Sequence, residues 1–248
     1  SVTGMTETSL LQQDISKKTL TALAEKNLIQ HENVAIKVTE ENNEILQTPL
    51  TANTEQQYAI DQVLHAQQHY QAFLLDGLTG SGKTEVYLQI MQEVLKQGKQ
   101  ILVLVPEIGL TPQTIQRFRS RFACTTVILH SALNDTKRLA AWQAAQTGQA
   151  SIILGTRSAI YTPLPRLGLI ILDEEHDLSF KQQEGFRYHA RDVGMYRAYT
   201  EKCPIILGSA TPSVDSYALV KQQKMIHLTL NQRAGGASLP NMHVIDLK

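Results

Sequence analysis

The stretch FLLDGLTGSGKTEVYLQI, residues 73–90, decides the fold. Its apolar start at 73–77 is typical of a buried strand, and the helical stretch that follows is expected at about residues 84–97. Between the two, the sequence fits G-x-x-x-x-G-K-[ST], the pattern of a loop that cradles the phosphates of a nucleoside triphosphate. Strand, loop and helix come in the order that such a loop requires. A glycine-rich turn that matches by chance is therefore a weak alternative.

Each residue type in this loop has an expected role. The glycines let backbone N–H groups turn toward phosphate oxygens, and the helix after them adds its dipole. We expect Lys83 to reach the β- and γ-phosphates and the Thr84 hydroxyl to hold Mg²⁺. The predicted nucleotide-binding loop comprises Gly77, Leu78, Thr79, Gly80, Ser81, Gly82, Lys83 and Thr84.

From residue 50 onward, strand-like and helical stretches alternate. The strand-like runs are almost wholly apolar, as expected of parallel strands buried on both faces. They lie at 73–77, 101–107, 125–130, 151–156, 167–175 and 204–210. Helical stretches are expected at about 84–97, 111–122, 135–147 (capped by Asp135) and 187–200. This order predicts an α/β fold with a doubly wound parallel sheet, in which ligands lie beyond the carboxyl ends of the strands.

The first part of the chain, residues 1–47, has a different pattern. A helical stripe begins at Ser16, a good N-cap, and Asn27 offers a break, while residues 34–45 alternate as in a small hairpin. We expect a partial winged-helix DNA-binding segment here, followed by the α/β domain at 48–248. The opening SVTGM reads poorly as a natural start, so the chain is expected to be a piece of a longer protein.

The composition is that of a globular protein, with 42% apolar and 19% charged residues. The formal net charge is +0, so a nucleic-acid partner would require a local basic surface. No apolar run approaches the roughly 18 residues of a membrane span. The cysteines, Cys124 and Cys203, are expected to be buried thiols in a reducing compartment, the cytoplasm, and the lack of C-x-x-C gives no support for a zinc site.

A second motif, LIILDEEH at residues 169–176, ends another apolar run. A strand there would bring Asp173 and Glu174 to the edge of the sheet where Lys83 lies. Asp173 is expected to contact Mg²⁺ through water, and Glu174 to polarise the water that attacks the γ-phosphate. A solvated acidic run after a strand is common by itself, but its pairing with the phosphate loop makes that alternative improbable.

Three further loops follow predicted strands, at 105–113, 155–163 and 208–213. Donors suited to a sugar-phosphate backbone lie in the first two, at Thr111, Gln113, Thr156 and Arg157. In the third loop, the hydroxyls of Ser209 and Thr211 would link the Glu174 region to the bound nucleic acid. Taken singly, each loop fits an ordinary polar connection with a helix cap better, with Thr111 and Ser213 as the caps.

The segment FKQQEGFRYHARD, residues 180–192, is rich in aromatic and basic side chains. The rings would stack on unpaired bases and the cations would meet phosphates. These residues are Phe180, Lys181, Phe186, Arg187, Tyr188, His189 and Arg191. Aromatic packing under a surface loop explains the segment about equally well.

Together, GLTGSGKT, VPEIGLTPQ, GTRSAIYTP, LDEEHD and GSATPS resemble motifs I, Ia, Ib, II and III of superfamily 2 helicases. The string DEEHDLSFKQQEGFRYHARDVGMYRA narrows the resemblance to the bacterial replication-restart helicases, from about residue 50 to the end. The resemblance implies a RecA-like motor lobe, with ATP and Mg²⁺, that unwinds branched DNA 3′ to 5′. It assigns Asp173, Glu174, Glu175 and His176 to a DEEH box that contacts the nucleotide. It assigns Gln56 to adenine recognition, although a solvent-facing helix glutamine is commoner.

The same resemblance implies forked and single-stranded DNA, other primosome proteins and single-stranded DNA-binding protein as partners. The family's second motor lobe, zinc-binding insert and 3′-end-binding domain are not in this sequence, so zinc is expected only in a downstream region, and an arginine finger only from the second lobe. The closing NMHVIDLK, 241–248, is expected to be a strand that leaves the first lobe.

Two other functions share these motifs. A DNA- and nucleotide-binding scaffold without turnover would have no need of Glu174. A double-stranded DNA translocase is disfavoured by the aromatic-rich segment. For the chain by itself, binding without turnover stays an open alternative.

Overall fold

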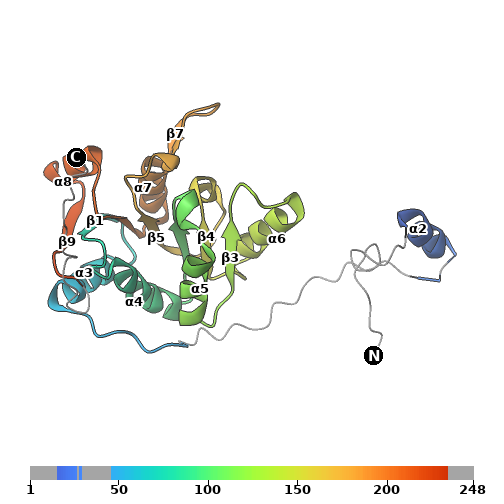
Figure 1. Ribbon diagram of the computed structural model, residues 1–248, viewed down its shortest axis with the longest axis horizontal. Coiled ribbons are helices and arrows are strands. Elements are labelled where there is room, and N and C mark those ends of the chain that lie inside the picture. Colours follow the sequence, from blue (N-terminus) through green and yellow to red (C-terminus); the bar gives the residue numbers. More distant parts are fainter. Residues whose placement is uncertain (1–15, 27, 30–45, 234–248) are drawn as a thin grey trace, which may run out of the picture. The chain divides into compact units, whose positions relative to one another are not determined.

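The computed structural model describes residues 16–26, 28–29 and 46–233 (Figure 1). The chain divides into two compact units, Ser1–Thr39 and Glu40–Lys248. The expected hairpin at 34–45 and the expected strand at 241–248 lie outside the described residues. The boundary between 47 and 48 and the winged-helix assignment stay predictions.

In the first unit, helix α2 spans Lys17–Glu25. The side chain of Ser16 accepts a hydrogen bond from the N–H of Thr19 at 3.2 Å, so the predicted N-cap is confirmed. The helix ends at Glu25, with Lys26 as its C-cap. The apolar stripe predicted for this segment extends to Leu28, but Leu28 follows the helix and is exposed.

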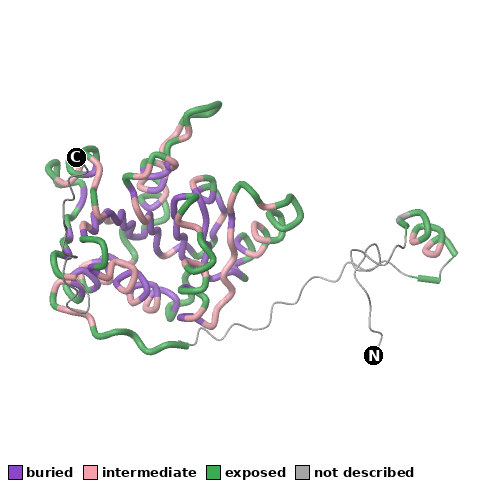
Figure 2. Tube along the Cα trace, in the orientation of Figure 1, coloured by how far each residue is buried: buried purple, intermediate pink, exposed green. Residues whose placement is uncertain are grey.

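The second unit contains a parallel sheet of seven strands among its described residues, which confirms the predicted doubly wound α/β fold. The strands are β1 (Gln71–Gly77), β2 (Gln100–Leu104), β3 (Thr126–Leu129), β4 (Ile152–Gly155), β5 (Leu167–Asp173), β8 (Pro204–Ser209) and β9 (Ile226–Leu230). Their order across the sheet is β3-β4-β2-β5-β8-β1-β9. Figure 2 shows the sheet as the buried centre of this unit.

Helices cover both faces of the sheet, because the alternate side chains of each strand feed two separate apolar cores. One core holds side chains of α3 (Thr54–His65), α4 (Lys83–Lys96) and α5 (Pro112–Arg121). The other holds those of α6 (Asp135–Gln146) and α7 (Ala190–Glu201), with α8 (Val214–Lys221) packed against it. Short 3₁₀ turns lie at η1 (Glu107–Gly109), η2 (Arg157–Tyr161) and η3 (Leu178–Phe180).

Several predicted bounds were wrong for local reasons. The second strand ends at Leu104, because Pro106 leads into η1. The helix expected from residue 187 begins at Ala190, because the segment before it forms a small antiparallel hairpin of β6 (Lys181–Gln182) and β7 (Tyr188–His189). Helix α6 is capped by Asn134, whose side chain accepts from Lys137 N–H at 2.9 Å, and not by Asp135. Helices α3 and α8 and strand β9 were not predicted.

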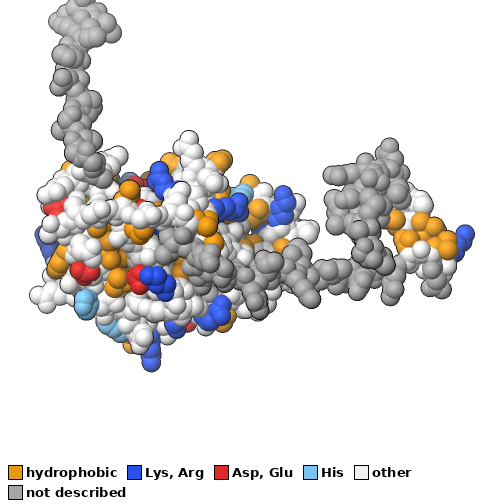
Figure 3. Space-filling model, turned by 90° about the horizontal axis from the view of Figure 1, so that it is seen from below, with side chains coloured by type: hydrophobic (Ala, Val, Ile, Leu, Met, Phe, Trp, Pro, Cys, Tyr) orange, Lys and Arg blue, Asp and Glu red, His pale blue; other side chains and the backbone are white. Residues whose placement is uncertain are grey.

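The two cysteines differ in their exposure. Cys203 is buried as expected, but Cys124 is only partly buried. On the face shown in Figure 3, lysine and arginine side chains are scattered among acidic, apolar and uncharged ones. Within the described ranges, no helix has the length and apolar character that crossing a membrane requires, and no group of three or more side chains is arranged to hold a metal ion.

Candidate nucleotide site and adjoining hairpin

Three neighbouring strands deliver the predicted site to one edge of the sheet. Strand β8 lies between β5 and β1, and Gly208 is in register with Asp173 on one side and Leu75 on the other. The loop after β1 and the turn after β5 therefore flank the end of β8. The structure thus brings the phosphate-loop residues and the DEEH residues together, as parallel topology predicts.

The loop after β1 is shaped by its glycines and its lysine. Gly80 and Gly82 have φ values of 80° and 86°, in the region that favours glycine. The Lys83 Nζ donates to the carbonyl oxygen of Gly77 at 2.8 Å, which curls the lysine over the loop. A Cβ on Gly77 would lie 2.6 Å from the Oγ of Ser81, so this position requires glycine. Among the described residues that Oγ is fully buried and has no hydrogen-bond partner.

Gln56 supports the loop from helix α3. Its backbone and side chain form a capping box with Asn53, and its amide nitrogen donates to the carbonyl oxygen of Ser81 at 2.8 Å. Its side chain is buried, so the solvent-facing alternative is wrong. Both ends of the amide already have protein partners, and the adenine contact stays a prediction.

Tyr87 joins the phosphate-loop helix to the DEEH residues, and the sequence reasoning missed it. Its Oη donates to Oδ1 of Asp173 at 3.1 Å. Burial, and next the negative charge of Asp173, hold the pKa of Tyr87 well above its usual range. Burial, and next the charge of Glu174, raise the pKa of Asp173. A Cβ on Gly208 would fall 1.6 Å from the Tyr87 Oη, so this glycine makes room for the contact.

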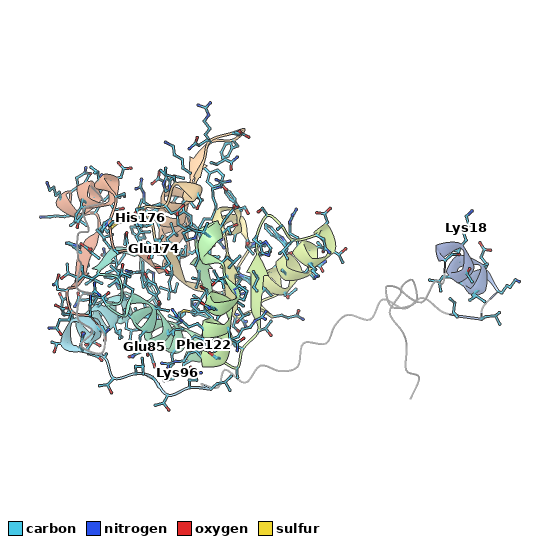
Figure 4. The ribbon with its side chains drawn as sticks, in the orientation of Figure 1. Lys18, Glu85, Lys96, Phe122, Glu174 and His176 are labelled. Atoms are coloured by element: carbon cyan, nitrogen blue, oxygen red, sulfur yellow. The ribbon has the colours of Figure 1, made fainter. Side chains whose placement is uncertain are left out.

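The residues Asp173–His176 form what we call the catalytic turn. Strand β5 ends at Asp173, two residues earlier than predicted, because Glu174 takes a left-handed backbone conformation with φ 52°. The side chain of Glu174 is 40% exposed, and its Oε2 lies 3.6 Å from Nδ1 of His176 (Figure 4). That same nitrogen lies 2.7 Å from Oγ of Ser209, which also accepts from Thr211 N–H at 2.9 Å. The Ser209 hydroxyl thus contacts the catalytic turn, and the link from Ser209 and Thr211 onward to bound DNA stays a prediction.

Glu175 is placed differently from its neighbours. It was expected to contact the nucleotide through the DEEH box, but it is 1% exposed. Its carboxylate accepts from Ser213 N–H at 2.7 Å and from the hydroxyl of Ser216 at 2.9 Å. It therefore points into the protein, toward the start of α8.

Residues 181–189, which we call the hairpin, follow the catalytic turn closely. Figure 2 shows the hairpin as an exposed projection. Phe186 is 81% exposed, and its ring lies 6.3 Å from that of Tyr188, which in turn makes an edge contact with Tyr161 at 5.1 Å. Lys181 and Arg187 are exposed as well. Phe180, by contrast, is fully buried in the core, so for this ring the packing interpretation fits and base stacking does not.

Two arginines that were expected to meet DNA phosphates are engaged within the protein. The Nη1 of Arg157 donates to the carbonyl oxygens of Ser179 and Lys181, at 2.9 and 3.1 Å. Arg191 is 6% exposed, and its guanidinium donates to Asp192 and Asp215. Both arginines support the base of the hairpin, and the guanidinium of Arg191 is buried, whereas Arg157 is partly exposed.

The other residues that were predicted near bound DNA include helix caps, one exposed donor and one buried threonine. Thr111 and Ser213 are the N-caps of α5 and α8, as was predicted for ordinary polar connections with helix caps. Gln113 is exposed on the first turn of α5, whereas Thr156 is buried at 4%. His189 caps α7 and accepts from Arg191 N–H at 3.2 Å, and burial, then the charge of Arg191, lower its pKa.

Comparison of the sequence with known proteins shows that the chain is similar to helicases. Residues 53–220 match the family model described as DEAD/DEAH box helicase. The chain is similar to the replication restart protein PriA of Haemophilus influenzae, with 52% identity over 209 residues, covering 84% of this chain and 28% of that protein. It is also similar to the replication restart protein PriA of Synechocystis, with 45% identity over 242 residues, covering 95% of this chain and 28% of that protein. The chain thus spans under a third of the length of these relatives.

Solved structures agree on the fold. The structure of RecG bound to a three-way DNA junction matches with a TM-score of 0.58 at 22% identity, covering 76% of this chain and 25% of that one. At that level of identity the match shows the architecture alone, which is a RecA-like α/β fold.

Proposed function

Because the chain belongs to the DEAD/DEAH box helicase family, we propose that residues 48–248 are the first motor lobe of an ATP-driven DNA helicase of replication restart. We propose further that residues 1–47 are part of a winged helix. The observation that carries the proposal is that the phosphate loop and the catalytic turn flank the end of β8, with the hairpin directly after the turn. A motor needs this proximity, because DNA contact has to influence hydrolysis.

The residues present fit a nucleoside triphosphate with its metal ion. The buried Ser81 Oγ, which has no partner within the described ranges, and the two left-handed glycines form a cradle of the kind that holds phosphates. Lys83 would exchange its bond to Gly77 for the β- and γ-phosphates. Thr84 and Asp173 would hold Mg²⁺, which supplies charge that neutralises the phosphate oxygens. Tyr87 would keep Asp173 aimed at that ion.

Glu174 has the place that a general base requires. Its carboxylate is partly exposed at the edge of the sheet, where it can orient a water molecule and accept its proton. His176 lies next to it and bonds to Ser209, so hydrolysis would be sensed by the loop after β8. These contacts support a catalytic role for the left-handed turn.

For DNA, we propose that the exposed residues of the hairpin and of the first loop form the contact surface. The exposed Phe186 and the half-buried Tyr188 offer rings for unpaired bases, and the exposed Lys181, Arg187 and Gln113 offer donors for phosphates. The RecG structure that shares this fold holds a three-way DNA junction, and the PriA relatives are named for replication restart. We therefore propose forked and single-stranded DNA as substrates, other primosome proteins and single-stranded DNA-binding protein as partners, and the bacterial cytoplasm as the location.

The test is steady-state ATP hydrolysis by this chain, and by a longer form that includes a second motor lobe, with and without single-stranded DNA. A cation from a second lobe contributes roughly 10³–10⁵ in rate in related chemistry, so this chain should turn over slowly and respond little to DNA. The longer form should show DNA-stimulated hydrolysis. Binding of ATP and DNA by the longer form without turnover would identify a scaffold instead, and equal stimulation by duplex DNA would favour a translocase.

A further inference from the structure

Glu175 is a buried carboxylate next to the proposed general base, and the catalytic chemistry has no use for it. The side chain is 0% exposed, which is costly for a charge unless it is fully partnered. Its Oε1 accepts from Ser213 N–H, and its Oε2 accepts from the hydroxyls of Ser213 and Ser216 at 3.1 and 2.9 Å. Its own N–H donates to the carbonyl oxygen of Gly208 at 2.9 Å. The residue is thus bonded by backbone and side chain to the segment that leaves β8.

The Ser213 hydroxyl is the junction of this network. Its one proton has two acceptors within reach, Oε2 of Glu175 at 3.1 Å and the Ser216 hydroxyl at 3.0 Å. It accepts from Ser216 N–H and from Nη1 of Arg191, both at 3.2 Å, so its two lone pairs are filled. A shift of any one partner therefore changes the bonds available to the others.

Arg191 carries the network to the hairpin. It lies in the first turn of α7, which begins directly after β7, and its Nη1 is 4.0 Å from Oε2 of Glu175. Its remaining nitrogens donate to Asp192 at 3.0 Å and to Asp215 at 3.3 Å. The guanidinium thus holds the end of the hairpin against the start of α8.

The backbone of Glu174 depends on the same network. A left-handed glutamate is uncommon and persists only where the surroundings determine it. Glu175 N–H donates to the carbonyl oxygen of Gly208, and Asp177 N–H donates to the Glu174 carbonyl oxygen at 2.9 Å, so both bonds hold the peptide group that joins Glu174 to Glu175. Anything that moves the Glu175 side chain consequently acts on the orientation of Glu174.

We propose that Glu175 is a positioning residue that couples the hairpin to Glu174, acting through Ser213 and Arg191. The inference rests on the proposed function and adds the route by which DNA at the hairpin stimulates hydrolysis. Movement of the hairpin would shift Arg191, then the Ser213 hydroxyl, then the carboxylate next to the general base. A purely structural role would lower stability without changing the response to DNA.

The test is Glu175→Gln in the longer, two-lobed form of the protein. The amide cannot accept at both ends as the carboxylate does, so the network loses a bond while the shape is kept. We expect the stimulation of kcat by single-stranded DNA to fall at least about tenfold, with the KM for ATP within about twofold of the parent, as a positioning residue predicts. The matched control is Glu93→Gln, the same change at a partly exposed glutamate on α4 that pairs with Lys96 outside this network, and which should keep its stimulation within about twofold.

Arg191→Lys is the second variant, because it keeps the charge and loses the fork that reaches Ser213. It should also reduce the stimulation of kcat by single-stranded DNA. If Glu175→Gln does not fold, Arg191→Lys alone tests the coupling route. Normal stimulation in folded Glu175→Gln, or in Arg191→Lys, overturns the coupling route and leaves the proposed function intact. A parent protein that hydrolyses ATP without any response to DNA overturns the proposed function, and the inference with it.

Discussion

The catalytic turn and the hairpin are neighbours in sequence, but the structure holds them in different ways. In the turn, the peptide group between Glu174 and Glu175 makes two backbone hydrogen bonds, and Glu175 is buried with three side-chain hydrogen bonds. In the hairpin, Arg157 fixes the carbonyl of Lys181 at one end and His189 caps a helix at the other, while Phe186 at the tip is 81% exposed. One region is fixed at every residue, and the other is fixed at its two ends.

This difference suits the two proposed tasks. A general base has to be in position before the reaction, because reorganisation during the reaction would raise the barrier. A surface that meets successive unpaired bases has to adapt, and stacking tolerates different bases because each has a flat face. A substitution in the turn should therefore change rate or stability sharply, and one at the hairpin tip should change DNA binding alone.

The largest effect is expected from Glu174→Gln in the two-lobed form. The amide keeps the shape but cannot accept the proton, so kcat should fall by roughly 10²–10⁴. Nucleotide binding, measured with a fluorescent ATP analogue, should stay within a few fold. The contrasting variant is Lys83→Ala, which removes the cation proposed to face the phosphates and should lose binding itself. Equal loss of affinity in both variants would mean that Glu174 binds the nucleotide and is not the base.

The next largest effect tests how tightly the turn is packed. In Gly208→Ala the new methyl group would overlap the Tyr87 Oη, and such overpacking costs about 1–3 kcal/mol in the free energy of unfolding. Tyr87→Phe in the same chain should restore part of the loss, although the ring carbon would still be 2.9 Å away. In the hairpin, Gly185 has φ 67° and nothing within 4 Å of an added Cβ, so Gly185→Asn should be nearly neutral, since asparagine tolerates this conformation. Urea unfolding of Gly208→Ala, Gly208→Ala with Tyr87→Phe, and Gly185→Asn would measure these changes in the free energy of unfolding. Equal losses of stability in Gly208→Ala and Gly185→Asn would contradict the comparison between turn and hairpin.

The sequence predicted the turn better than the hairpin, for a physical reason. Buried parallel strands are continuous apolar runs, so the ends of β1, β5 and β8 could be located within a few residues. The phosphate loop and the DEEH residues follow those ends, and parallel topology then brings them to one edge. The apolar runs do not predict the backbone conformation in which each strand ends, as the left-handed Glu174 shows.

Side-chain direction was the information that the sequence lacked. The aromatic-rich segment has no clear period, so nothing separated the buried Phe180 from the exposed Phe186. Arginine is usually found at the surface, and that rule fails for Arg191 because acids from α7 and α8 surround it. Tyr87 was missed although its position carried a signal, since it lies one helical turn after Lys83.

A smaller effect is expected at the hairpin tip, from Phe186→Ala. Removing one stacking ring should weaken single-stranded DNA binding by about 1 kcal/mol, or roughly fivefold, by fluorescence anisotropy. Thermal stability should not change beyond about 0.5 kcal/mol, because the side chain is exposed. The control is Tyr196→Ala, an exposed aromatic on α7 outside the hairpin, which should leave DNA binding unchanged. Equal losses in the two variants would show that the hairpin has no special part in binding.

The smallest effect concerns the end of the hairpin, where His189 gives it a dependence on pH. Burial, and next the charge of Arg191, lower the pKa of His189 from its usual value of 6.5. The neutral ring accepts from Arg191 N–H at its Nδ1, and a protonated ring cannot. As pH falls below about 6.5, the unfolded chain binds a proton that the folded chain resists, so the stability present above that pH is progressively lost. The hairpin end should therefore loosen in mild acid.

Trypsin cleavage after Arg187 reports that loosening, because this residue lies at the exposed part of the hairpin. The matched variant is His189→Asn, which keeps a capping oxygen and does not titrate in this range. The ratio of the cleavage rates of the two proteins cancels the pH dependence of the protease itself. We expect the parent to be cut progressively faster than the variant between about pH 7 and about pH 5. A constant ratio over this interval would mean that the hairpin end is held by Arg157 and packing alone, and the contrast between a fixed turn and an adjustable hairpin would then lie at the tip and not at the base.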